Sequence, residues 1–84
     1  MKWTVAYEPS AKDELARRWL NSSNRQALAN AANYVDRILR TDPMAAGESR
    51  EGGRRVLIAP PLAVYFDVRP DDCLVIVWHV IESK

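Results

Sequence analysis

The chain has one cysteine, Cys73, so it can form no internal disulfide and holds no cysteine cluster for a structural zinc ion. Its apolar residues form no stretch near the roughly 20 residues needed to cross a bilayer. Its first residues lack the long apolar segment of a secretion signal. These absences predict a cytoplasmic protein with no membrane partner, whose stability depends on packing or on a protein partner.

The chain also lacks an excess of charge of one sign, because the formal net charge of the 84 residues is +1. The sequence therefore gives no global electrostatic argument for binding nucleic acid. The apolar fraction of 48% and the three tryptophans are, in contrast, enough for a folded core in a short chain. We expect one domain over residues 1–84, with Trp3, Trp19 and Trp78 in its core.

The first half of the chain predicts one strand followed by two helices. Residues 2–7 alternate apolar and polar side chains, as a strand does. Ser10 fits a helix N-cap, and Ser23 with Gln26 forms a second capping signal after the polar break at residues 21–24. Because this break is short, the helices should form an antiparallel hairpin. Apolar residues of the second helix recur at core-facing spacing: Leu28, Ala31, Ala32, Val35, Ile38 and Leu39.

The second half of the chain predicts a three-stranded antiparallel meander. After a loop at residues 44–53, three apolar, β-branched runs are separated by turn signals at residues 59–61 and 69–72. The last run, residues 74–81, is apolar on both faces except at His79, which predicts a central strand. The fold class is therefore α+β, in the order β-α-α-β-β-β, with an antiparallel sheet and the helical hairpin packed on one face.

Two adjacent arginines, Arg54 and Arg55, open the meander. Neighbouring strand residues point to opposite faces, so only one arginine can face a ligand on a given side. Guanidinium groups bind phosphate oxygens well, and histidine is the residue type suited to proton transfer near neutrality. His79 is the only histidine of the chain. Solvated or salt-bridged arginines and a half-buried histidine are the alternative interpretation of these three residues.

The order of the elements and their landmarks resemble the RelE/ParE superfamily of toxins from bacterial type II toxin–antitoxin systems. The similar segments run through the chain: residues 9–15, 35–39, 42–43, 53–55, 61–68 and 75–80. The resemblance implies a compact β-α-α-β-β-β fold and a small antitoxin protein as partner. RelE-like members cut mRNA on the ribosome without a metal or other cofactor, whereas ParE-like members act on DNA gyrase.

A RelE-like function implies particular roles for the candidate residues. Arg54 or Arg55 would bind the scissile phosphate, and His79 would transfer a proton or act as a second cation. Glu48 or Glu51, in the loop before the meander, would supply a carboxylate base, and Glu82 is a further candidate. The resemblance thus predicts a metal-independent endoribonuclease with mRNA on the ribosome as its target.

Two features favour a different class of function. Ala63 stands where RelE-like members usually offer an arginine, and residues 82–84 contain no aromatic side chain. The competing hypothesis is a ParE-like inhibitor of DNA gyrase or a non-catalytic binding protein with the toxin fold. In either case we expect the antitoxin on the apolar surface of the helical hairpin or on a sheet edge. That edge would be the second meander strand or the first strand of the chain.

Overall fold

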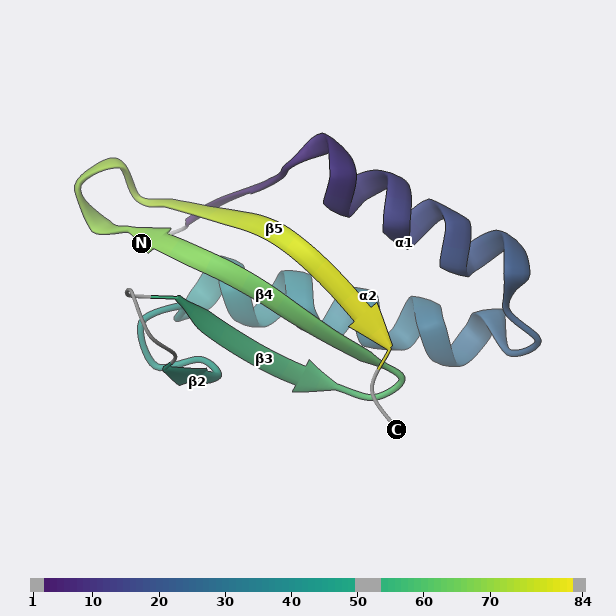
Figure 1. Ribbon diagram of the computed structural model, residues 1–84. Coiled ribbons are helices and arrows are strands. Elements are labelled where there is room, and N and C mark those ends of the chain that lie inside the picture. Colours follow the sequence, from purple (N-terminus) through teal and green to yellow (C-terminus); the bar gives the residue numbers. More distant parts are fainter. Residues whose placement is uncertain (1–2, 50–53, 83–84) are drawn as a thin grey trace.

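Figure 1 shows the computed structural model, which describes residues 3–49 and 54–82. The α+β class and the predicted order of elements are confirmed, with one short additional strand inside the expected loop. The elements are β1 (Thr4–Tyr7), α1 (Pro9–Asn21), α2 (Arg25–Thr41), β2 (Glu48–Ser49), β3 (Arg55–Ala59), β4 (Leu62–Arg69), the 3₁₀ helix η2 (Pro70–Asp72) and β5 (Leu74–Glu82).

The described strands form one mixed sheet in the order β1-β5-β4-β3-β2. The meander of β3, β4 and β5 is antiparallel as predicted, and β2 pairs antiparallel with the start of β3. β1 differs from the antiparallel prediction because it lies parallel to β5, with Thr4 opposite Leu74 and Tyr7 opposite Val77. Parallel pairing requires a long crossover connection, and the chain between β1 and the meander, which contains both helices, is long enough to supply it.

The position of β4 corrects one prediction about docking. β4 is the middle strand, and both of its neighbours, β3 and β5, are hydrogen-bonded to it. The second meander strand is therefore not a sheet edge on which a partner strand could be added. Among the described strands the edges belong to β1 and β2.

Both helices begin at residues other than the predicted caps. α1 starts at Pro9 with Glu8 as N-cap, and no side chain caps it. Proline suits the first helical position because the missing N–H has no partner there anyway, so the helix starts before Ser10. α2 is capped by Asn24, whose side chain accepts a hydrogen bond of 3.1 Å from the Ala27 N–H. The predicted cap, Ser23, is one residue away.

The core lies between the sheet and the helices, which cover one face of the sheet (Figure 1). Trp3 packs against this core as predicted, but Trp19 is 41% exposed on α1 and Trp78 lies on the opposite face of the sheet. The prediction of three core tryptophans is thus wrong for two. The largest side chains that are almost fully buried come from both layers: Phe66, Leu39, Leu62, Val35, Val64, Val75, Val77 and Val80.

Candidate functional site

The side of the sheet that faces away from α2, here called the open face, carries the residues of interest. A bulge between β4 and β5 decides which of them reach it. Tyr65 pairs with His79, whereas Phe66 pairs with Val77, so Trp78 is the extra residue. Phe66 and Val77 are fully buried on the helix side, while Tyr65 and Trp78 are half-buried and His79 is exposed. The bulge therefore turns two successive side chains, Trp78 and His79, toward the open face.

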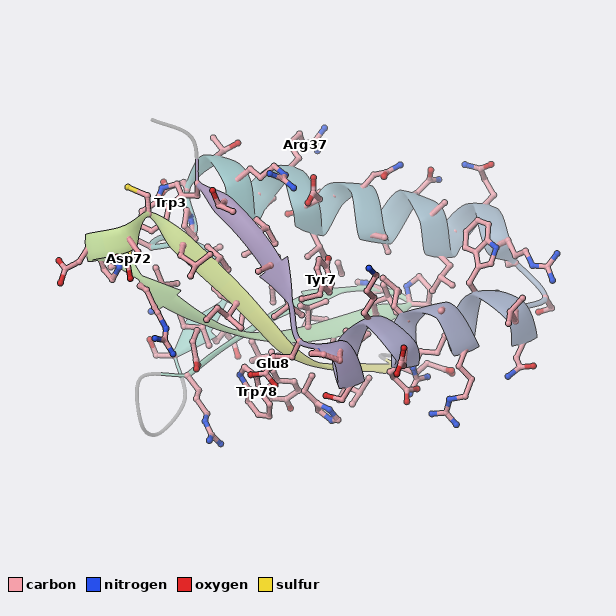
Figure 2. The ribbon with its side chains drawn as sticks, turned by 90° about the horizontal axis from the view of Figure 1, so that it is seen from above. Trp3, Tyr7, Glu8, Arg37, Asp72 and Trp78 are labelled. Atoms are coloured by element: carbon pink, nitrogen blue, oxygen red, sulfur yellow. The ribbon has the colours of Figure 1, made fainter. Side chains whose placement is uncertain are left out.

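Three rings and one cation meet there, and we call Arg54, Tyr65, Trp78 and His79 the open-face cluster. The Trp78 and His79 rings stack with centroids 5.7 Å apart and planes 20° apart. The Tyr65 ring is tilted against both, at 5.4 Å from Trp78 and 5.6 Å from His79. The Arg54 guanidinium lies over the indole ring, 4.7 Å from its centroid. Figure 2 shows Trp78 projecting from the sheet on the side away from α2.

The two adjacent arginines separate, as strand alternation predicts. Arg55 has its guanidinium on the segment that precedes β2, where it donates to the carbonyl oxygens of Met44 at 2.7 Å and Ala46 at 3.3 Å. It also donates to the Ser49 hydroxyl at 3.1 Å. Backbone carbonyls and a hydroxyl thus replace the acid or solvent expected as its partner. Arg54 is left as the arginine of the open-face cluster.

The register places Glu48 in line with the cluster but far from its histidine. Glu48 pairs with Val56, Val56 with Tyr65, and Tyr65 with His79, so one row crosses four strands. Neighbouring strands lie about 4.8 Å apart, so the backbones of Glu48 and His79 are roughly 14 Å apart. The structure does not bring these two candidates together. Glu51 lies outside the described residues.

Two polar atoms near the cluster are buried, and no protein partner for either is found among the described residues. One is the indole Nε1 of Trp78, which is a donor, and the other is Oδ1 of Asp67, which is an acceptor. Asp67 pairs with Ile76 on β5, two residues before Trp78. The open face therefore combines flat aromatic surface with the Arg54 cation, the exposed His79 imidazole and unpaired polar atoms.

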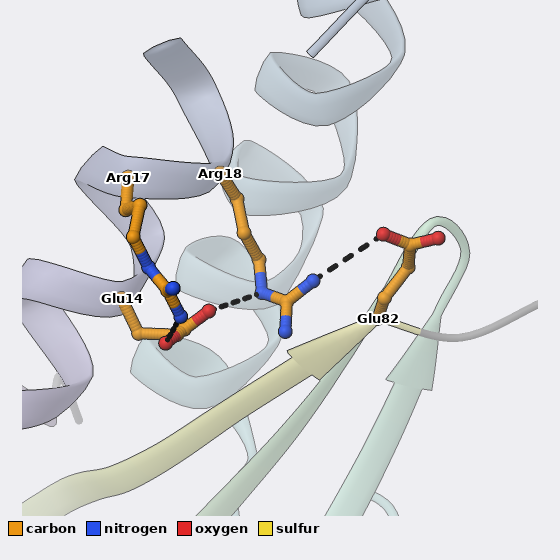
Figure 3. A network of polar contacts seen from close by, with 4 residues as sticks. All are labelled: Glu14, Arg17, Arg18 and Glu82. Carbon is orange, nitrogen blue, oxygen red and sulfur yellow. Dashed lines mark hydrogen bonds and ion pairs between the residues drawn. The ribbon is translucent and has the colours of Figure 1, made fainter. Parts of the chain in front are cut away.

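A second polar assembly joins α1 to the end of β5, as Figure 3 shows. Glu14 pairs with both Arg17 and Arg18, and Arg18 also reaches Glu82 at 3.3 Å. The Arg17 hydrogen bond lowers the pKa of the Glu14 carboxyl, against an opposing effect of desolvation, and the charges of both arginines and His79 lower it further. These side chains rim a cleft of about 760 Å³ between the helix hairpin and the β3–β4 turn. Glu82 is thus in an ion pair outside the open-face cluster.

Sequence reasoning missed Trp78 as a site residue, although the sequence contains a signal for it. Strict alternation would place His79 on the same face as Val75 and Val77, inside the core. Burying an imidazole without a hydrogen-bond partner among valines costs free energy. Strict alternation is therefore unfavourable here, which indicates that the alternation of side chains shifts before His79. Such a shift is what brings Trp78 and His79 to the same face.

The described residues contain neither a metal-binding cluster nor a membrane-spanning helix. In residues 3–49 and 54–82, no group of three or more histidine, cysteine, aspartate or glutamate side chains is arranged to hold a metal ion. No helix of this part of the chain is long and apolar enough to cross a membrane.

Comparisons with known proteins give similarity at the level of structure. No protein-family model matches the sequence, and no curated protein matches it. Among solved structures, the RelBE2 toxin–antitoxin complex from Mycobacterium tuberculosis is similar with a TM-score of 0.76 and 16% identity, over 99% of this chain and 93% of that one.

Two further solved structures are similar to this chain in fold. The chromosomal ParDE toxin–antitoxin system from P. aeruginosa has a TM-score of 0.71 and 14% identity, over 99% of this chain and 98% of that one. The isolated RelE toxin from E. coli has a TM-score of 0.66 and 15% identity, over 98% of this chain and 85% of that one. The chain therefore has the RelE/ParE toxin fold.

Proposed function

We propose that the chain is the toxin of a type II toxin–antitoxin pair and that a small antitoxin protein neutralises it. The support is the fold, which matches toxin–antitoxin complexes over nearly all of this chain. The apolar surface expected for the antitoxin is available, because Leu20 is 70% exposed and Trp19 41% exposed on α1. β1 offers the remaining predicted sheet edge.

We infer further that the toxin is a RelE-like, metal-independent endoribonuclease that cuts mRNA on the ribosome. The observation that carries this inference is the bulge, which places His79 on the same open face as Arg54. Both side chains contact the Trp78 ring, whose centroid lies 4.7 Å from the Arg54 guanidinium and 5.7 Å from the centroid of the His79 ring. A cation and an imidazole that share one ring as neighbour can act on one phosphodiester and its leaving group.

The reaction would use the RNA's own 2′-hydroxyl. Its oxygen attacks the adjacent phosphorus, and the bond from phosphorus to the 5′-oxygen of the next nucleotide breaks. His79 gives a proton to that leaving oxygen, and solvent water takes the proton of the 2′-hydroxyl. Arg54 binds the non-bridging phosphate oxygens, where negative charge builds up. The products are a 2′,3′-cyclic phosphate and a 5′-hydroxyl.

A second candidate function has its own supporting observation. Arg55 is occupied by the segment before β2, and Ala63 is buried in the middle strand, so Arg54 is the one arginine placed in the open-face cluster. Arg54 would then stabilise the charge of the transition state nearly alone, and one cation gives weaker stabilisation than two. This favours a ParE-like gyrase inhibitor or a non-catalytic binding protein as the alternative.

The experiment is to map new mRNA 5′ ends after brief induction in bacteria that lack the antitoxin. The native chain is compared with the Arg54→Ala/His79→Ala variant. Arg37→Ala is the matched control, because Arg37 also lies over an aromatic ring, that of Tyr34, but on α2. The nuclease gives codon-phased ends with the native chain and the control, and none with the double variant. Growth arrest without new ends would contradict the nuclease and support gyrase inhibition.

A further inference from the structure

The Trp78 ring has an unusual position for a large aromatic side chain in so small a protein. It belongs to neither the core nor an isolated surface position, because it is half-buried between Tyr65 and His79 on the open face. The bulge that places it there also places His79. Its indole Nε1 has no protein partner among the described residues. The ring is therefore held on the open face by Tyr65, His79 and Arg54.

A planar cation covers this ring. Arg54 is exposed, and its guanidinium lies 4.7 Å from the ring centroid. A guanidinium and a nucleobase are both flat and stack on tryptophan in the same way, so they compete for the same surface. Arg54 also has a stronger alternative partner, because a phosphate oxygen accepts charge-assisted hydrogen bonds that a ring cannot accept. A nucleotide can thus take the ring while its phosphate takes the arginine.

We propose that Trp78 is the stacking platform for one base of a single-stranded RNA. Arg54 covers the ring in the free protein and moves to a backbone phosphate when the base arrives. The ligand is single-stranded, since the bases of a duplex are already stacked on each other. This proposal rests on the proposed function, because it assigns a substrate-binding residue to the same face, but it concerns binding and not cleavage.

The test is the affinity of the full chain for a short 2′-O-methyl RNA oligonucleotide, measured by fluorescence polarisation over a range of salt concentrations. This probe has no free 2′-hydroxyl, so it can be bound but not cut by the proposed reaction. Trp78→Ala should weaken binding about 10- to 100-fold with an unchanged salt dependence. Trp78→Phe should retain most of the affinity, which separates loss of the ring from loss of the fold.

Two comparisons assign the roles. Arg54→Met should reduce the slope of log affinity against log salt by about 0.7, the contribution of one phosphate contact to a single strand. Tyr34→Ala is the matched control, because Tyr34 is also a partly exposed aromatic ring with an arginine over it, and it should leave the affinity unchanged. A probe with one abasic position at the stacked base should bind the native chain and Trp78→Ala equally.

Several results would overturn the proposal. These are equal affinity of native chain and Trp78→Ala for the intact probe, the same loss with the abasic probe, or no binding by the native chain. Each is independent of the proposed function, which is decided by the mRNA 5′ ends. If the native chain gives codon-phased cleavage and Trp78→Ala binds the probe as tightly as the native chain, the nuclease is supported and the stacking role of Trp78 is wrong. If Trp78→Ala loses affinity but the native chain gives no cleavage, the stacking role is supported and the nuclease is wrong.

Discussion

The guanidinium of Arg54 lies 4.7 Å from the centre of the Trp78 indole, although the two residues come from neither the same strand nor neighbouring strands. The contact crosses β4, because Arg54 precedes β3 and Trp78 belongs to β5. The adjacent Arg55 instead secures the chain before β2. Two neighbouring arginines thus have different tasks, one on the open face and one in the scaffold, and single substitutions should separate them.

Arg55→Ala should lower the free energy of unfolding by about 2 kcal/mol, because it removes three hydrogen bonds of a half-buried cation. Arg54→Ala should lower it by less than about 1 kcal/mol, the value of an exposed cation–π contact. Urea denaturation of the two variants and the native chain measures both quantities. Equal losses for the two arginines would contradict this division.

His79→Gln should reduce the rate of mRNA cleavage on purified ribosomes by about 100-fold or more, the usual contribution of a general acid. His79→Arg should be equally impaired, since a guanidinium keeps its proton and cannot give it to the leaving oxygen. Cleavage that survives in His79→Arg would instead show that this position supplies a second cation. Neither substitution should change the urea midpoint much, because His79 is exposed.

Gly47→Ala should destabilise the fold by about 2 kcal/mol or more. Gly47 has a φ of +68°, and a Cβ there would lie 2.3 Å from the carbonyl oxygen of Val56. The backbone would have to move away from β3, and the Arg55 contacts on this segment would move with it. Ala45→Ser, in the same segment, is the control and should change stability by less than about 0.5 kcal/mol. Thermal unfolding followed by circular dichroism distinguishes the two variants.

Glu14 should make the fold sensitive to acid. The pKa of Glu14 is lowered in the folded chain, chiefly by the Arg17 hydrogen bond. Its contribution to stability is therefore complete above the ordinary glutamate pKa of about 4.3 and is lost as the pH falls through the lowered folded-state pKa. As the pH falls from about 6 to about 3, the urea midpoint of the native chain should approach that of Glu14→Gln.

Arg17→Met is the companion variant for this measurement, because it removes the main cause of the shift without touching the carboxyl. At neutral pH, the urea midpoint of Arg17→Met should lie closer to that of Glu14→Gln than the native midpoint does. A constant separation between the native chain and Glu14→Gln across the whole pH range would show that Glu14 acts through packing and not through its charge.

The helices were the most predictable part of the fold. The spacing of Leu28, Ala31, Val35 and Leu39 predicts the buried face of α2, and all four are buried. An ion pair between Asp36 and Arg40, one helical turn apart, lies on the surface of the same helix at 2.8 Å. Helical periodicity is a local property of the sequence, so it can be read without knowing which elements are neighbours.

The sheet was less predictable, because pairing joins segments that are distant in sequence. The sequence of residues 4–7 does not indicate that this segment pairs with β5 or that the two strands are parallel. The bulge is similarly a property of two strands together, since Trp78 becomes the extra residue only when Tyr65 pairs with His79. The sequence therefore predicted that one of Arg54 and Arg55 would face the site, but not which one, and it left Trp78 in the core.

The pairing of β1 with β5 has a consequence for synthesis of the protein. Thr4–Tyr7 is translated before both helices and the meander, whereas its partner, residues 74–77, belongs to β5. β1 can therefore join the sheet only after the helices, β3, β4 and β5 have been synthesised. A nascent or prematurely terminated chain that lacks β5 also lacks Trp78 and His79. Under the proposed function, such a fragment would have neither the stacking ring nor the proton donor, so we expect it to neither bind nor cut RNA.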